Sequence, residues 1–133
     1  MSAALALVRR APGSHTCAAG GHSVLVSGVR FDVLDRAAFL RMLDGLLACG
    51  QSHVIHFLAA HPTVEARSDE RYRRILNEGT INLPDGLPVV WAGRAMGVTL
   101  LRLTGTDAMQ LVCRWGLERH LAHAFYGGGP TRC

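Results

Sequence analysis

The residue best suited to chemistry is Asp85, which stands between a proline and a glycine in the tripeptide Pro84-Asp85-Gly86. A short β-prone run at residues 80–83 precedes it, and the sites of α/β proteins lie beyond the carboxyl ends of their strands. A carboxylate held there can act as a general base, and Gly86 lets a substrate approach the backbone closely. The same tripeptide is also a common β-turn. Spacing alone favours the turn.

A second polar group lies in the segment RLTGTD, residues 102–107. The guanidinium of Arg102, the hydroxyl of Thr104, the loop at Gly105 and the carboxylate of Asp107 would suit a phosphate or the hydroxyls of a sugar. The alternative is a capped helix beside a solvated arginine. Glycines 127 and 128 follow an expected strand at 122–126, and such a loop usually leads into a helix whose N-terminus can hold a phosphate.

The charged residues exclude several classes of enzyme. The chain has 133 residues and a net charge of +4, and all 14 of its basic residues are arginine. Without a lysine there is no Walker A loop and no Schiff-base chemistry. A bound pyrophosphate must therefore contact arginines, backbone amides or a helix N-terminus. The arginines form no dense patch, so nucleic acid is not an expected partner.

Histidines and cysteines indicate no metal or cofactor site. His53 and His56 are three residues apart on an expected strand, so they point to opposite faces. The four cysteines lie far apart without a CxxC pair, and with no secretory signal they fit a reducing cytosol. No segment reads as a membrane span. We therefore expect a cytoplasmic protein that needs no metal and no cofactor.

These side chains need a scaffold, and the apolar pattern predicts alternating strands and helices. Strands are expected at residues 23–29, 53–60, 80–83 and 122–126. Helices are expected at 36–49, from 62, from 68 to 79, at 89–96 and at 107–120. The alternation predicts an α/β, Rossmann-like layered fold with a largely parallel sheet. Residues 1–21 are expected to be a flexible leader, and residues 22–133 to form the domain.

Capping residues and core side chains refine this expectation. Asp35, Ser68 and Thr106 are the expected N-caps of three helices. Ile75 is expected to face inward on its helix. The tryptophans at positions 91 and 115 lie at helical spacing with other apolar residues, so both are expected in the core.

Four blocks of the sequence together resemble the WecG/TagA/CpsF family of bacterial glycosyltransferases. They extend from about Ser23 to Gly128 and read VLVSGVRFDVLDRAAFL, INLPDGLPVVWAGRAMG, LLRLTGTDAMQLV and AHAFYGG. The second and third blocks are specific, because PDG followed by VVWA and then by R-x-T-G-x-D is hard to obtain by chance.

The resemblance implies an inverting transfer of an N-acetylmannosamine-type sugar from a UDP donor to a polyprenyl-pyrophosphate-linked acceptor. Such transfers serve the synthesis of teichoic acid, common antigen or exopolysaccharide. The resemblance implies that Asp85 is the general base, that Arg102 binds the pyrophosphate, and that the TGTD loop helps to build the pocket. It also implies peripheral contact with the inner face of the plasma membrane, made by parts of the family outside this segment.

The chain departs from the family pattern in two places. Where the family commonly has a Thr-x-Asn-Pro-like segment, this chain has Ala59-Ala60-His61-Pro62, so His61 stands where the pocket amide would be. The chain also stops at Cys133, before the helix expected after the glycines. We therefore expect the N-terminal portion of a longer enzyme, apparently truncated, with an incomplete UDP site.

Two other functions remain open at this point. A truncated, non-catalytic fragment acting as a binding or interaction module would expose apolar surface and could form a homo-oligomer. A nucleotide-dependent oxidoreductase is disfavoured, because no GxGxxG motif follows the first expected strand.

Overall fold

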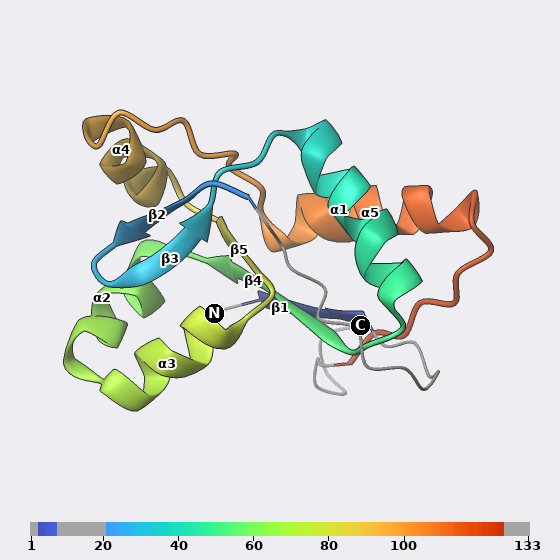
Figure 1. Cartoon of the computed structure of the whole chain (residues 1–133), viewed down its shortest axis with the longest axis horizontal. Coiled ribbons are helices and arrows are strands. Elements are labelled where there is room, and N and C mark those ends of the chain that lie inside the picture. The colour runs from blue at the N-terminus through green and yellow to red at the C-terminus, as the bar shows by residue number, and fades with distance from the viewer. Residues whose placement is uncertain (1–2, 8–20, 127–133) are drawn as a thin grey trace, which may run out of the picture.

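Parallel strands β4 (His53–Leu58) and β5 (Ile81–Pro84) form the centre of the fold. Strand β1 (Ala3–Leu7) pairs with the other side of β4 in the antiparallel direction, so the sheet order is β1-β4-β5. The computed structural model describes residues 3–7 and 21–126. It confirms the expected α/β class (Figure 1). Residues 3–7 form a strand where a flexible leader was expected, because pairing with β4 is a long-range contact that local sequence does not reveal.

Strands β2 (Ser23–Val26) and β3 (Val29–Asp32) form an antiparallel hairpin, which is a second, separate sheet. The single strand expected over residues 23–29 was therefore wrong. Ser27 and Gly28 make the turn, with φ angles of 53° and 81°. Two-residue hairpin turns require this left-handed backbone, and the Ser-Gly pair is the sequence signal for it.

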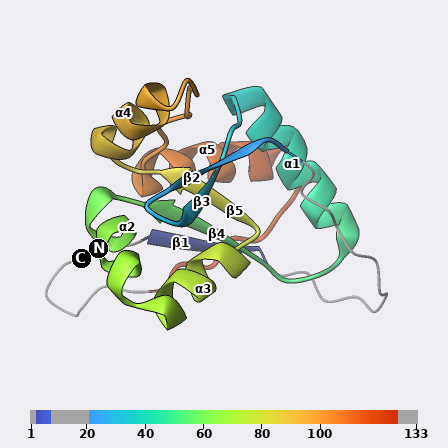
Figure 2. The same ribbon diagram turned by 60° about the vertical axis from the view of Figure 1, so that its left-hand side comes forward.

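The helices in the described part of the chain lie on both faces of the β4–β5 pair. Their bounds are α1 Arg36–Cys49, α2 Ala60–Ser68, α3 Glu70–Glu78, α4 Leu87–Ala95 and α5 Gly105–Leu117. Successive side chains of a strand point to opposite faces. Ile55 of β4 and Leu83 of β5 accordingly pack with α1 and α5, whereas Leu58 packs with the hairpin and with α3 and α4. Figure 1 shows α1 and α5 on the right and α2, α3 and α4 on the left, and in Figure 2 α5 runs behind the strands.

The N-caps decide where three of the helices begin. Asp35 caps α1, as expected. Helices α3 and α5 begin differently: Asp69 rather than Ser68 caps α3, and Thr104 rather than Thr106 caps α5. In each case two good capping residues stand within two positions of each other. Local sequence does not rank them, because tertiary packing selects the one that is used.

Three further expectations were wrong. Residues 122–126 form no strand. Both edges of β4 are already occupied, by β1 and β5, so no ladder on β4 is open to this segment. Ile75 and Trp91 were expected in the core, but they are 51% and 57% exposed. Trp115 is buried, as expected.

A buried polar network fixes the hairpin against β5. The Asn82 backbone N–H donates to Asp32 Oδ2 at 2.8 Å, and its side-chain Nδ2 donates to the carbonyls of Arg30 and Leu76, both at 2.9 Å. Both amide hydrogens of Asn82 are thereby used. The contact of 2.9 Å between Asn82 Oδ1 and His56 Nδ1 therefore requires that the histidine nitrogen carries the proton and donates.

Asp32 is the buried charge of this network, with 2% of its surface exposed. Burial raises the pKa of its carboxyl above the ordinary 3.8, while the hydrogen bond from Asn82 and the charge of Arg30 act in the lowering direction. The Arg30 guanidinium lies 3.7 Å from Asp32 Oδ2 and also donates to the Gly79 carbonyl. The network thus joins β3, β5 and the end of α3.

Candidate functional site

Three loops meet at the carboxyl edge of β4 and β5. The Asp85 N–H donates to the Leu58 carbonyl at 3.0 Å, so the end of β5 lies against the end of β4. The Leu103 N–H donates to the Pro84 carbonyl at 3.1 Å, which holds the segment before α5 beside the end of β5. This is the edge at which open α/β sheets bind their ligands. The structure therefore brings together residues 59–61, 85–86 and 102–105.

Two helices begin at this edge without a side-chain hydrogen bond to the N–H groups of their first turns. Ala59 is the N-cap of α2 and Gly86 is the N-cap of α4, and neither makes a side-chain capping hydrogen bond. The first N–H groups of a helix have no partner within the helix, and its dipole makes this end positive. The arrangement favours an anion such as a diphosphate.

Asp85 is half-buried beside these helix starts. Within the described part of the chain, its carboxylate makes no hydrogen bond and no ion pair, whereas its backbone is fixed by the bond to Leu58. An accessible carboxylate on a fixed backbone can accept a proton from a bound hydroxyl. Gly86 follows it and opens α4.

Arg102 is exposed, and its guanidinium has no partner among the residues that the structure describes. Its position is nevertheless fixed, because Leu100 and Leu103 on either side are 3% and 7% exposed and anchor the segment in the two cores. A free guanidinium held next to the carboxyl edge of β5 can donate two parallel hydrogen bonds to a phosphate.

Thr104, Gly105 and Asp107 have a structural role in the start of α5. The Thr104 hydroxyl donates to Asp107 Oδ2 at 2.7 Å, and it accepts from the Asp107 N–H at 3.1 Å. Gly105 is the first residue of the helix. Their part in binding a sugar stays a prediction, since the polar atoms of Thr104 and Asp107 already serve the cap.

His61 lies in the first turn of α2, and its side chain is exposed. It is 3.7 Å from Glu65 and lines an open depression of about 470 Å³ together with Ala60, Val64 and Glu65. This depression lies beside the start of α2. A role of His61 in substrate binding stays a prediction. Gly127 and Gly128 lie outside the described residues.

Sequence reasoning missed the backbone donors of the site. No side chain among the described residues caps α4, and the N–H groups of its first turn belong to Leu87 and Val89, two apolar residues that carry no chemical signal of their own. The indirect signal was Pro88, because proline is enriched in the first turn of a helix. Pro62 gives the same signal in α2.

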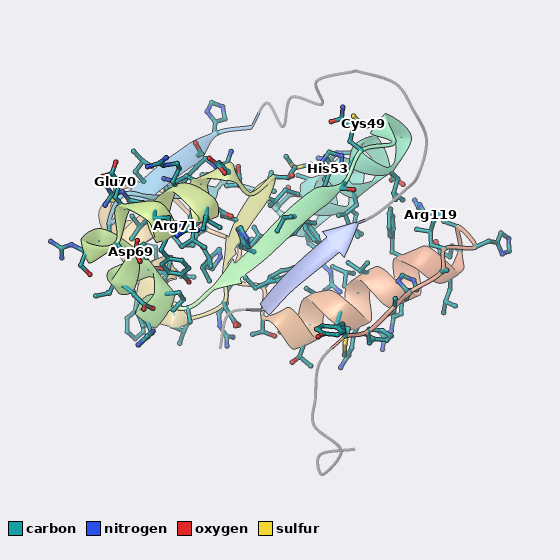
Figure 3. The ribbon with its side chains drawn as sticks, turned by 90° about the horizontal axis from the view of Figure 1, so that it is seen from below. Cys49, His53, Asp69, Glu70, Arg71 and Arg119 are labelled. Carbon is teal, nitrogen blue, oxygen red and sulfur yellow. The ribbon has the colours of Figure 1, made fainter. Side chains whose placement is uncertain are left out.

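No metal site is evident in residues 3–7 and 21–126, where no three His, Cys, Asp or Glu side chains are placed to hold an ion. His53 contacts the Thr80 hydroxyl at 3.3 Å and lies at the start of β4, close to Cys49 (Figure 3). Asp85 lies beside the other end of β4, where its N–H donates to Leu58. Cys49 is disulfide-bonded, whereas reduced cysteines were expected; Cys113 is free.

The fold and the edge described above define an α/β protein with a site for an anionic ligand next to an accessible carboxylate. The model of the glycosyl transferase WecG/TagA/CpsF family matches residues 24–132, and the chain belongs to this family. Membership indicates a glycosyltransferase of cell-surface polysaccharide synthesis. No curated protein matches the chain. No helix among the described residues is long and apolar enough to span a membrane.

Proposed function

We propose that this chain carries the acceptor-activating part of an inverting glycosyltransferase. It would move an N-acetylmannosamine-type sugar from a UDP donor to a polyprenyl-pyrophosphate-linked acceptor at the inner face of the plasma membrane. The observation that supports the proposal is that the Asp85 carboxylate, which has no partner among the described residues, lies beside the starts of α2 and α4, which no side chain caps there. One group can take a proton there, while the others can hold a diphosphate.

The reaction assigns each of these groups one task. Asp85 takes the proton of the attacking acceptor hydroxyl, and the hydroxyl oxygen forms a bond to the anomeric carbon of the donor sugar. The bond between that carbon and the UDP oxygen breaks, so UDP leaves from the opposite side and the configuration inverts. Arg102 and the first amides of α2 and α4 stabilise the charge on the leaving diphosphate.

A transfer assay tests the proposal. The chain, together with any longer reading frame that continues past Cys133, is incubated with UDP-N-acetylmannosamine and a lipid-pyrophosphate-linked sugar. Formation of UDP together with an extended lipid product supports the proposal. UDP formation without the lipid product would contradict the acceptor assignment, and absence of both products from the longest frame would contradict the enzyme assignment.

A second candidate function is a non-catalytic interaction module. It is favoured by the alanine at position 59 and the histidine at position 61, which replace pocket residues of the family pattern, and by the exposure of Leu117, Phe125 and Tyr126. The DNA downstream of Cys133 separates the two functions. A continuing or frame-shifted homologous sequence favours the enzyme, whereas an unrelated gene directly downstream favours the short module.

A further inference from the structure

Helix α4 presents an apolar face to the solvent. Val89, Val90 and Gly93 are buried and hold the helix against the core. Leu87 and Trp91 project on the other side and are 47% and 57% exposed. Pro88, Arg94 and Ala95 complete this α4 face, because residues at spacings of three and four lie on the same side of a helix.

The orientation of the α4 face is rigid rather than adjustable. A side chain at Gly93 would meet Leu100 at 2.8 Å, so the turn after α4 packs closely under the helix. Leu100 itself is 3% exposed and belongs to the same core as Val89. The exposure of Trp91 is therefore a consequence of this packing, because α4 cannot rotate without separating Gly93 from Leu100.

The charged residues of α4 and of the segment that follows it are arginines, and the Asp85 carboxylate lies two residues before Leu87. From residue 86 to residue 106 the chain contains no Asp and no Glu, and its only charged residues are Arg94 and Arg102, both exposed. Exposed Trp and Leu beside Arg is the composition of a surface that lies in the interfacial region of an anionic bilayer. The arginines would be attracted to the negative headgroups of such a bilayer.

The α4 face begins directly beside the candidate site. Leu87 is two residues beyond Asp85, and Arg102 is held near the same end of β5 by the bond from Leu103 to Pro84. A bilayer that contacts Leu87 and Trp91 would thus lie close to the carboxyl edge of the sheet. The pyrophosphate of a lipid-linked acceptor lies at this interface.

We propose that the α4 face, formed by Leu87, Pro88, Trp91, Arg94 and Ala95, docks on the surface of an anionic bilayer. The family resemblance implies membrane contact only through parts outside this segment, and helical spacing placed Trp91 in the core. The purpose of the contact, presenting a lipid-linked acceptor to Asp85, rests on the proposed function. The contact itself does not require any reaction.

Vesicle binding tests the proposal without substrate. The chain is mixed with vesicles of equal parts phosphatidylcholine and phosphatidylglycerol, and with vesicles of phosphatidylcholine alone, and bound protein is measured by co-sedimentation. We expect stronger binding to the anionic vesicles and a blue shift of tryptophan emission. Because Trp115 is buried, the shift reports on Trp91.

Matched variants locate the contact. Leu87→Ser and Arg94→Gln should each lower the partition coefficient about fivefold. Leu117→Ser and Arg114→Gln, which change exposed residues of the same types on α5, should leave it unchanged. Equal losses in both pairs, or no preference for anionic vesicles, would overturn the proposal.

Two further outcomes are informative. A blue shift that grows with protein concentration in the absence of vesicles would show that the α4 face is a contact between copies of the chain, and the bilayer assignment would be wrong. The transfer assay separates this proposal from the proposed function. Vesicle binding by the chain together with absence of transfer activity in the longest reading frame would support the docking surface and contradict the enzyme assignment.

Discussion

Asp85 donates its backbone N–H to the carbonyl of Leu58 at 3.0 Å, so the carboxylate is positioned by main-chain geometry at the junction of two parallel strands. No described side chain binds the carboxylate itself. Substitution of the side chain should therefore alter its chemistry and leave its backbone setting intact.

Asp85→Asn should abolish general-base catalysis while preserving the fold. We expect the transfer rate to fall by about 10²- to 10⁴-fold, the usual contribution of a general base. The rate is measured by UDP release in the longest active form of the protein. Asp44→Asn, which changes an exposed carboxylate paired with Arg119 on the α1 side, is the control. Retention of full activity in Asp85→Asn would remove Asp85 from the mechanism.

Arg102→Lys should weaken UDP binding more than it affects folding. Lysine keeps the charge but loses the planar pair of donors that fits a diphosphate. We expect an affinity loss of about tenfold, equivalent to about 1.4 kcal/mol, with little change in Tm. Titration calorimetry measures the affinity in the longest form of the protein, because the UDP site of the 133-residue chain is expected to be incomplete. Arg114→Lys on α5 is the control. If both variants bind UDP like the unaltered chain, Arg102 does not contact the nucleotide.

Gly79→Ala should destabilise the fold through one steric contact. A Cβ at this position would lie 2.5 Å from His56 Nδ1 and 3.0 Å from Asn82 Oδ1, and would push the two side chains of the buried network apart. We expect a loss of about 1–3 kcal/mol in the free energy of unfolding, measured by denaturant titration. Gly45→Ala is the matched control.

A Cβ at Gly45 in α1 meets nothing within 4 Å. The control should therefore gain up to about 1 kcal/mol from the better helix propensity of alanine. A Gly79→Ala variant as stable as the Gly45→Ala variant would show that the network tolerates displacement.

The buried Asp32 should make stability depend on pH. Its pKa is raised in the folded state, mainly by burial, so the folded protein binds its proton more tightly than the unfolded chain. The stabilisation that this carboxyl gives the folded state is complete below the ordinary pKa of 3.8. It is lost as the pH rises through the raised pKa of the folded state. Asp32→Asn keeps the hydrogen bond from the Asn82 N–H but removes the titration.

The measurement is the free energy of unfolding of both proteins over this pH range. The free energy of unfolding of the unaltered chain should fall relative to that of Asp32→Asn as the pH rises above 3.8. A difference that is constant or moves in the opposite direction would contradict a raised pKa.

Local sequence predicted the elements whose signals are local. The stripe from Phe39 to Leu46 and the cap at Asp35 predicted α1 correctly, and Gly79 ends α3 as expected. The two parallel strands were also predicted in nearly the observed places. The Ser27-Gly28 pair is a turn signal, and it indicates a hairpin within residues 23–29, where a single strand was expected. The pairing of residues 3–7 with β4 depends on a partner about 50 residues away, so no local pattern reveals it.

The candidate site was only partly predictable for a related reason. Asp85 and Arg102 stand out as side chains with suitable chemistry, and the topology explains why their loops meet. The amides at the start of α4 belong to apolar residues, so composition gives no sign of them. The exposure of Trp91 was not predictable from helical spacing, because spacing identifies a stripe but does not say which stripe faces the core.

The hairpin of β2 and β3 is joined to β5 and to α3 through side chains, by hydrogen bonds that connect residues 47 to 52 positions apart. A hairpin forms within about 1–10 µs, whereas docking must close a much longer loop, so we expect the hairpin to form before it docks. Native-state hydrogen exchange should therefore show a partial opening in which β2 and β3 stay paired. The backbone N–H of Asn82, which donates to Asp32 Oδ2, becomes free to exchange in that opening.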